Sequence, residues 1–542
     1  MHYKRNPLLI FFALWFTLIP LTFILQGCTP PTTHQHNKHS FQAVESTIAQ
    51  LHLALSRKTD NCKNITETFL KRIKTYDQST DLNAIILINE NAIKKAETLD
   101  IEYARTKQLR PLHCIPVILK DNFDTADMPT EAGSIALKGS FPADDAFMVK
   151  RLREAGAIIL ARSNMSEWAF SAYNTISSTH GETRNAYNIQ HVPAGSSGGT
   201  ASAIAASFAI IGMGTDTGNS IRGPASHLSL VGMRSTIGLT SRDGIVPLMH
   251  NRDIAGPLTR TVEDGARTFN IISGYDAADP MTHNPHSKKN TDYTRQLKKS
   301  GLKGVRLGVI RQLYDTELAD FEVLDLMDQA IKDLKNAGAI IIDPFEIKHF
   351  KKLRKASGFC SRFRYDLNQY LSTLKHSHKQ GKNNTRRIRK FQDIIDRQLY
   401  GEHSRRDMNW AASVKIPPQQ QQPPCTGIQD DPRRRHLLAA VLQAMDRQNI
   451  EAIIYPTWSN PPREIGDNTS PHGDNSSTIA PHTGQPAITV PMGYTSNNLP
   501  AGLEFLARPF DDAQLFEYAY AYEQQTRHRR PPVLFPPLSI SK

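Results

Sequence analysis

Three residues with complementary chemistry lie at a strand end and in two glycine-rich loops: Lys120, Ser196 and Ser220. A serine hydroxyl is a weak nucleophile, and it attacks a carbonyl carbon only when a nearby base accepts its proton. A lysine can be that base if burial keeps its amine neutral, because a free lysine has a pKa near ~10.4. These three residue types could therefore form an acyl-enzyme.

The two serines lie at opposite ends of one helix–strand unit. Residues 195–199 read GSSGG and open an Ala-rich helix, an apolar strand follows at 210–213, and a second loop, GTDTGNS, spans 214–220. The pentapeptide GSSGG alone is typical of a flexible linker. Here a buried helix and a second glycine cluster follow it directly, which favours a unit that folds back until both loops meet.

Lys120 follows the apolar strand 117–119 and precedes the polar pair Asp121-Asn122. Ligand sites of α/β proteins usually lie at the carboxyl ends of strands. A single lysine is by default a surface residue, but its position after an apolar strand favours burial.

These motifs resemble those of the amidase signature family. The pair GSSGG…GTDTGNSIR is similar to the family's GGSSGG…G[TS]DTGGSIR, and residues 115–122 (IPVILKDN) resemble its strand that ends in lysine. The resemblance extends from about residue 41 to 535. It implies a single large α/β domain with a central mixed sheet covered by helices on both faces, and no cofactor.

The resemblance also implies roles for individual residues. Ser220 would be the nucleophile, Ser196 the bridge after a cis peptide bond, and Lys120 the base. The oxyanion hole would consist of backbone N–H groups of Thr217, Gly218, Asn219 and Ser220. A role in bracing the loop or contacting substrate is expected for Ser197, Asp216 and Arg222. Ser197 competes with Ser196 as the bridge, and the 24-residue spacing to Ser220 favours Ser196.

Three positions depart from glycines of the family pattern. Ala194 is a small change, and Cys114 is interpreted as a packing change beside the strand. Asn219 is expected to keep the loop geometry, because asparagine tolerates left-handed backbone best after glycine. Its side chain is expected to narrow or polarise the pocket.

The N-terminus predicts export. Lys4 and Arg5 precede an apolar run, residues 8–25, which ends at Leu25-Gln-Gly-Cys28. This is a charged region followed by an apolar core, as in signal peptides, and its end resembles a bacterial lipobox. Cleavage would leave a lipid on Cys28. An uncleaved anchor is the alternative, because the apolar run approaches a spanning length.

The predicted organisation is a signal peptide at 1–28, a polar tether at 29–40 and an amidase domain at 41–535. The histidines of the tether favour a solvated linker over a metal site. The residue that follows Cys28 is Thr29 and not aspartate, and this suits sorting to the periplasmic face of the outer membrane in a Gram-negative cell.

Net charge is +13, and 16 Lys/Arg against 5 Asp/Glu fall within 351–407. Without a nucleic-acid motif, this run is interpreted as a solvated helical face, and no nucleic-acid partner is expected. The surrounding region, 350–450, is helical and basic; in the family it often lies over the substrate entrance. Four cysteines (Cys62, Cys114, Cys360 and Cys425) show neither CxxC pairing nor metal-ligand spacing, so they define no disulfide and no metal site.

Periodicity predicts the other elements. Helices are expected at 41–57, 64–75, 90–105, 144–155, 321–337 and 511–527; strands at 82–88, 157–160, 303–311, 339–343, 452–457, 484–492 and 502–506. Thr261 is expected to cap a helix with Asp264 in a capping-box spacing. Trp168, Phe170 and Tyr173 are interpreted as core residues.

An exported amidase acting on a small-molecule or peptide amide is the leading functional prediction. Peptide, aryl and fatty amides all remain open as substrates, and no GxSxG elbow supports another hydrolase class. One alternative is the glutaminase subunit of a tRNA-dependent amidotransferase, which the export signal disfavours. Another is a catalytically inactive envelope lipoprotein, which the complete Lys120/Ser196/Ser220 set disfavours.

Overall fold

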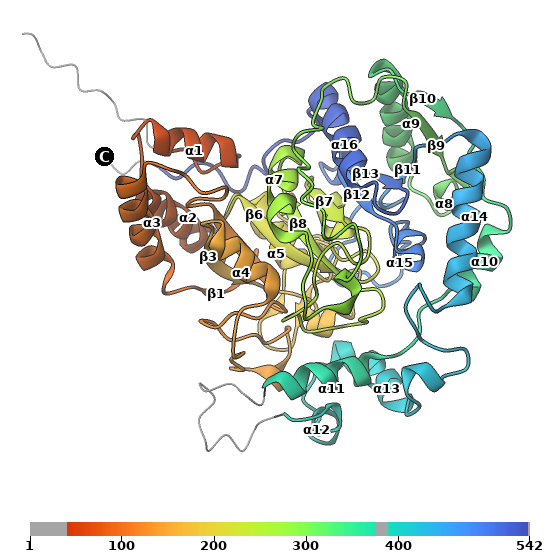
Figure 1. The fold of residues 1–542 in the computed structure, drawn as a ribbon, viewed down its shortest axis with the longest axis horizontal. Helices are drawn as coiled ribbons and strands as arrows, with labels where there is room; N and C mark the ends of the chain where they lie inside the picture. Colours follow the sequence, from red (N-terminus) through yellow and green to blue (C-terminus); the bar gives the residue numbers. More distant parts are fainter. Residues whose placement is uncertain (1–40, 375–387, 540–542) are drawn as a thin grey trace, which may run out of the picture. The chain divides into compact units, whose positions relative to one another are not determined.

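The apolar runs of the chain form one large mixed sheet, and the segments between them form helices on both of its faces (Figure 1). The computed structural model describes residues 41–374 and 388–539. The predicted signal peptide and tether, 1–28 and 29–40, therefore lie outside the described residues. From residue 41 on, the chain forms one compact unit. The predicted fold class, a large α/β domain around a central mixed sheet, is confirmed.

The sheet has 11 strands among the described residues, in the order β1-β3-β2-β6-β8-β7-β12-β13-β11-β9-β10. β3, β2 and β6 run parallel, as do β11, β9 and β10, and the remaining neighbours pair antiparallel. The strands are β1 (Ile85–Ile88), β2 (Pro116–Lys120), β3 (Ile158–Ser163), β6 (Ile211–Asp216), β7 (Val231–Arg234), β8 (Ile254–Thr259), β9 (Arg306–Val309), β10 (Ile340–Ile342), β11 (Ala452–Pro456), β12 (Ala487–Tyr494) and β13 (Pro500–Ala507). A separate pair consists of β4 (Ile176–Ser177) and β5 (Gly181–Glu182).

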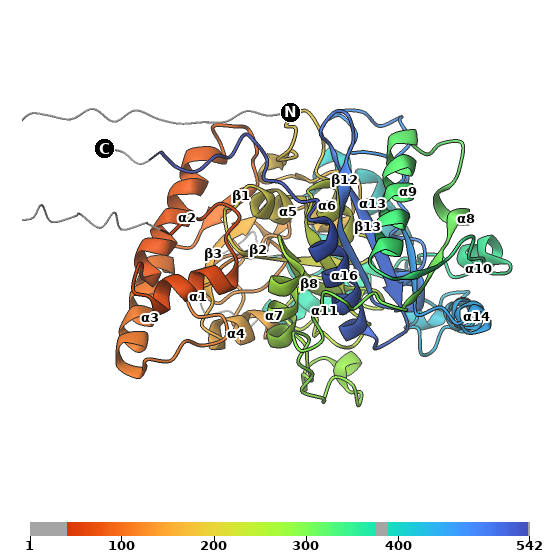
Figure 2. The ribbon, with the colours of Figure 1, turned by 90° about the horizontal axis from the view of Figure 1, so that it is seen from above.

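Helices α7, α16 and α9 pack side by side on one face of the sheet, and α5 and α6 pack on the other (Figure 2). The helices are α1 (Ile48–Ser56), α2 (Cys62–Tyr76), α3 (Ala92–Thr106), α4 (Phe147–Glu154), α5 (Gly198–Ala205), α6 (Arg222–His227), α7 (Val262–Ile272), α8 (Arg311–Tyr314), α9 (Phe321–Asn336), α10 (Phe350–Ala356), α11 (Phe363–Thr373), α12 (Phe391–Asp396), α13 (Arg405–Ser413), α14 (Pro432–Gln448), α15 (Ala480–Thr483) and α16 (Asp512–Thr526). None of the described helices is both long enough and apolar enough to cross a bilayer.

Two helix starts differ in detail from the sequence prediction. Helix α1 begins only at Ile48, because Thr47 and the side chain of the third helical residue form a capping box there. At α7, Thr261 accepts a hydrogen bond from the backbone N–H of Asp264, as predicted. The Asp264 carboxylate does not return to Thr261; it accepts the N–H of Ile48 at 3.1 Å, so it ties α1 to α7.

The segment from α11 to α13 contributes to a second apolar core. Helices α11, α12 and α13 lie together beside the turns that follow β3 (Figure 1). Trp168 and Phe170 pack edge-on against Phe363 of α11, which agrees with their predicted core role. Tyr173 is 38% exposed, so its core prediction is wrong.

Two disulfides join the four cysteines that the sequence left unassigned. Cys62–Cys114 ties the start of α2 to the turn before β2. Cys360–Cys425 ties the segment before α11 to the loop before α14.

Candidate active site

Parallel pairing brings the carboxyl ends of β2 and β6 to one edge of the sheet. Val117 of β2 lies opposite Ile211 of β6, and the register continues to Leu119 opposite Met213. Helix α5 packs on both strands. Lys120 at the end of β2, the loop that enters α5 and the loop that leaves β6 therefore meet at one place.

β6 extends to Asp216, although a loop was predicted from residue 214. The reason is its antiparallel pairing with β8, which continues to Asp216 opposite Ile254 and satisfies the backbone of these residues. The glycine-rich loop thus shortens to 217–220.

The amine of Lys120 is fully buried and has two hydroxyl partners. Its Nζ lies 2.7 Å from Oγ of Ser196 and 2.7 Å from Oγ1 of Thr215. Burial lowers the pKa of Lys120 to about 7, against the opposing influence of the carboxylates of Asp216 and Asp253. About half of the amine is therefore neutral at neutral pH, as a base requires.

The two adjacent serines have different partners. Ser196 contacts Lys120, and the peptide bond between Gly195 and Ser196 is cis, as the resemblance implies. The hydroxyl of Ser197 donates to the carbonyl oxygen of Thr215 at 3.2 Å and accepts its N–H at 3.4 Å. Ser197 thus links the loop before α5 to the end of β6, and of the two serines only Ser196 contacts the amine.

Glycine is required at position 195 because other parts of the backbone approach it closely. A Cβ at this position would lie 2.2 Å from the carbonyl oxygen of Asn174 and 2.5 Å from that of Ser171. No side chain fits there without moving the backbone.

Ser220 begins the turn into α6 and is 5% exposed. Its Oγ lies 3.5 Å from Oδ1 of Asn219; within the described part of the chain it has no hydrogen bond to Ser196. The loop before it is held by Thr217, whose hydroxyl donates to Asp253 at 2.5 Å.

The backbone N–H groups of the short loop are available as donors. In residues 41–374 and 388–539, no hydrogen bond uses the N–H of Thr217, Gly218, Asn219 or Ser220. Buried N–H groups are normally paired, so this row of free donors could receive a substrate oxygen.

A buried network of ion pairs and hydrogen bonds supports the loop 217–220. Arg222 donates to Asp216 at 3.0 Å and to the carbonyl oxygen of Gly218 at 2.7 Å, and it pairs with Glu504 of β13. Arg234 also pairs with Asp216, at 2.9 Å. Burial opposes ionisation of Asp216, but the two guanidinium groups outweigh it and hold the pKa of this carboxyl below its usual value.

The three departures from the family glycines behave differently from prediction. Ala194 has φ +62° and Cys114 has φ +64°, so both adopt the left-handed backbone that favours glycine. Neither is merely a small or packing change, and Cys114 is also half of a disulfide. Asn219 does not have positive φ, so the left-handed geometry expected at this position is wrong.

The side chain of Asn219 has room because the residue four positions later, Gly223, has no side chain. A Cβ at Gly223 would lie 2.9 Å from Nδ2 of Asn219 and 3.0 Å from the ring of Trp458. The asparagine side chain thus occupies space beside α6.

Sequence reasoning missed Thr215, Asp253, Arg234 and Glu504 as residues of the site. Thr215 lies within the GTDTG motif, one position before the predicted Asp216. Side chains alternate in direction along a strand, and this alternation along β6 could have indicated that Thr215 belongs to the site. The other three come from β7, β13 and the turn before β8, and no local pattern marks them.

One group of side chains has the composition of a metal site. Cys62, His113 and Cys114 are buried, with potential ligand atoms within 4.8 Å of one another. The two sulfurs are joined to each other in the disulfide, so they offer no thiolate to a metal.

Comparisons with known proteins match almost the whole described chain. The amidase family model matches residues 64–516. The native peptide amidase from Stenotrophomonas maltophilia superposes with a TM-score of 0.78 at 33% identity, over 91% of this chain and 99% of that chain. An Arabidopsis thaliana protein named as a probable amidase is 32% identical over 507 residues, covering 91% of this chain and 92% of that protein. A glutamyl-tRNA(Gln) amidotransferase subunit of Alkaliphilus metalliredigens is 29% identical over 505 residues, covering 89% of this chain and 96% of that protein.

Proposed function

The chain belongs to the amidase family and is a hydrolase of amide bonds, and we propose that it cleaves a terminal carboxamide through an acyl-enzyme on Ser220. The observation that carries the proposal is the buried amine of Lys120, with a pKa of about 7 and a 2.7 Å contact to Ser196. A peptide amide is the favoured substrate, since the peptide amidase of Stenotrophomonas maltophilia is similar over nearly its whole length.

Proton transfer in the proposed mechanism runs along two hydroxyls. Neutral Lys120 accepts the proton of Ser196, and Ser196 takes the proton of Ser220 as its Oγ attacks the carbonyl carbon. The carbonyl oxygen becomes an oxyanion, which the free N–H groups of residues 217–220 receive. The proton then returns along the same path to the leaving nitrogen, so ammonia departs and the acyl group stays on Ser220.

Deacylation repeats the sequence with water. Lys120 and Ser196 accept a proton from the attacking water, and Ser220 regains one as the acid leaves. In this mechanism the contact from Ser220 to Asn219 must first give way to one with Ser196. Catalytic hydrogen bonds are often loose before substrate binds.

A serine-directed fluorophosphonate probe and an ammonia-release assay test this proposal. The probe should label Ser220, and Ser220→Ala should abolish both labelling and hydrolysis of a peptide amide. Ser196→Ala should reduce kcat at least ~100-fold, the usual contribution of proton transfer. Ser197→Ala is the matched control, because this serine does not contact Lys120, and it should lose much less. Well-folded protein without labelling at Ser220 would support the inactive-lipoprotein alternative instead.

We also propose that the chain is exported and anchored by lipid on Cys28. The two disulfides, Cys62–Cys114 and Cys360–Cys425, support this, because disulfides persist in oxidising compartments and are rare in the cytosol. Labelled palmitate should be incorporated into the protein and not into the Cys28→Ser variant. Recovery in the cytosol with reduced cysteines would contradict export, and it would restore the alternative of a glutaminase subunit, which the amidotransferase relatives suggest.

A further inference from the structure

A large apolar side chain stands exposed beside the loop that carries the proposed oxyanion donors. Phe359 is 43% exposed. A Cβ at Gly218 would lie 3.5 Å from Cζ of Phe359 and 3.8 Å from Cβ of Ser477. The ring therefore lies against the loop at a place where solvent or substrate can reach it.

Arg252 holds the ring in this position. Its guanidinium lies over the Phe359 ring, 4.6 Å from the centroid, which is within the range of a cation–π contact. The same guanidinium donates to the carbonyl oxygens of Ser357 and Gly358, at 2.8 Å and 2.9 Å. His482 packs edge-on against the ring from another direction.

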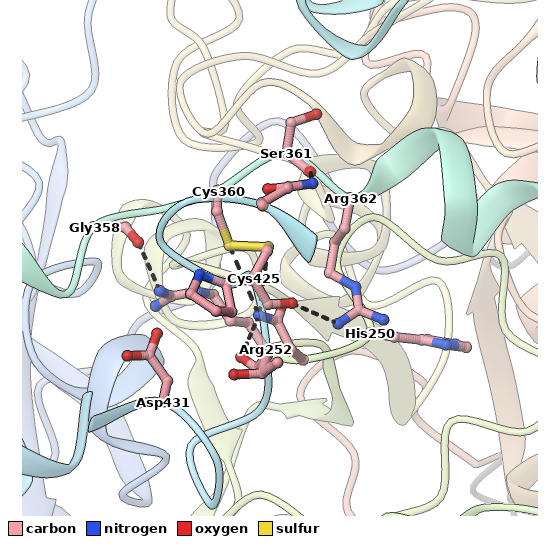
Figure 3. Close-up of a disulfide and its surroundings, with 12 residues drawn as sticks. His250, Arg252, Gly358, Cys360, Ser361, Arg362, Cys425 and Asp431 are labelled. Atoms are coloured by element: carbon pink, nitrogen blue, oxygen red, sulfur yellow. Dashed lines mark hydrogen bonds between the residues drawn. A yellow bond between two sulfur atoms is a disulfide. The ribbon is translucent and has the colours of Figure 1, made fainter. Parts of the chain in front are cut away.

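The Cys360–Cys425 disulfide fixes the other flank of Phe359. Figure 3 shows Arg252 directed at Gly358 on one side of the disulfide and Arg362 on the other. Arg362 donates to the carbonyl oxygen of Cys425 at 3.3 Å, and Cys425 is fully buried. The backbone on both sides of Phe359 is thus anchored, so the ring is pre-organised before substrate arrives.

We propose that Phe359 forms an apolar wall for the side chain of the residue whose carboxamide is cleaved, and that the disulfide positions this wall. The inference rests on the proposed function. When the carbonyl oxygen occupies the N–H groups around Gly218, the α-carbon of the acyl residue is two bonds away. Its side chain is therefore within reach of the Phe359 ring, whose edge lies 3.5 Å from where a Cβ at Gly218 would be, whereas the ammonia leaving group carries no substituent. The substrate class is a peptide amide with an apolar C-terminal residue, because burial of apolar surface is favourable.

The selectivity between two N-acetyl dipeptide amides, one ending in leucinamide and one in glycinamide, tests the proposal. In the unsubstituted protein, kcat/KM should favour leucinamide. Phe359→Ala should reduce this ratio about tenfold, mainly through KM for leucinamide, as expected for a lost apolar contact. Phe359→Tyr should retain it. The control Ile101→Ala, which removes a 71% exposed apolar side chain from α3, should leave it unchanged.

The double variant Cys360→Ser/Cys425→Ser tests the positioning role. It should lower the same ratio through KM while leaving the fluorophosphonate labelling of Ser220 intact, which a general loss of fold would not do. An unchanged ratio in Phe359→Ala overturns the inference and leaves the proposed function standing. A protein that hydrolyses neither amide and does not label at Ser220 overturns both.

Discussion

Acidification should switch off catalysis by protonating Lys120. The lysine acts as a base only when neutral, so activity rises with pH through its pKa, which burial lowers to about 7. The neutral fraction is then about one half at pH 7, about 10% at pH 6 and about 1% at pH 5. A lysine with pKa ~10.4 would be neutral at pH 7 in only about 1 molecule in 2,500. The difference corresponds to about 5 kcal/mol in favour of the neutral amine.

The measurement is kcat/KM for a peptide amide between pH 5 and pH 10, by ammonia release at constant ionic strength. The value should rise about tenfold per pH unit up to pH 6 and be level above pH 8. Acid unfolding caused by protonation of Asp121 and Asp512 should not produce the same fall in kcat/KM at low pH. Burial raises the pKa of both to about 7, so the folded state binds more protons than the unfolded state between about pH 4 and 7, and these groups stabilise it as pH falls. A rate still climbing above pH 9, or full turnover by Lys120→Ala, would refute the reasoning.

Three further predictions concern the structure that positions the site. Gly195→Ala should destabilise the fold by about 2 kcal/mol or more in a denaturant titration, because its Cβ meets backbone at 2.2 Å; Gly427→Ala, with open space, should stay within about 0.5 kcal/mol. Asp216→Asn should cost about 3–5 kcal/mol, because it leaves two buried guanidinium groups short of their partner, and an unchanged thermal midpoint would contradict the network. Replacing Cys62 and Cys114 by serine should cost about 4 kcal/mol, as estimated for a closed loop of 52 residues, and equal stability of both proteins would contradict a structural disulfide.

Local patterns predicted the parts of the site that lie on continuous segments. Lys120 follows an apolar strand, and the two serines lie in loops at the ends of one helix–strand unit. Parallel pairing of β2 with β6 then requires that their carboxyl ends coincide, so the meeting of Lys120 with the Ser196 loop follows from the fold class. The alternation of apolar segments was likewise sufficient to predict most helices and strands.

Contacts between distant segments could not be predicted in the same way. Arg222 pairs with Glu504 across 282 positions, and nothing in the sequence around either residue indicates the other. The disulfide pairing could not be predicted either, since four scattered cysteines allow three pairings. At Ala194 and Cys114 the resemblance did carry information, because a position where relatives have glycine can be one with positive φ. Asn219 shows that this inference is not general, because the family pattern has glycine there and yet the φ of Asn219 is not positive.

Burial lowers the pKa of Lys120 although two carboxylates that take no part in proton transfer oppose the shift. Asp216 and Asp253 are the carboxylates that favour a charged lysine. Neither forms an ion pair with it: Asp216 is bound by Arg222 and Arg234, and Asp253 accepts the hydroxyl of Thr217 and two backbone N–H groups. The hydrogen-bond partners of the amine among the described residues are the hydroxyls of Ser196 and Thr215 and the carbonyl oxygen of Thr215, all uncharged, so burial decides its charge. Arg222 thus supports the oxyanion loop and also binds one of the two carboxylates that favour a charged lysine.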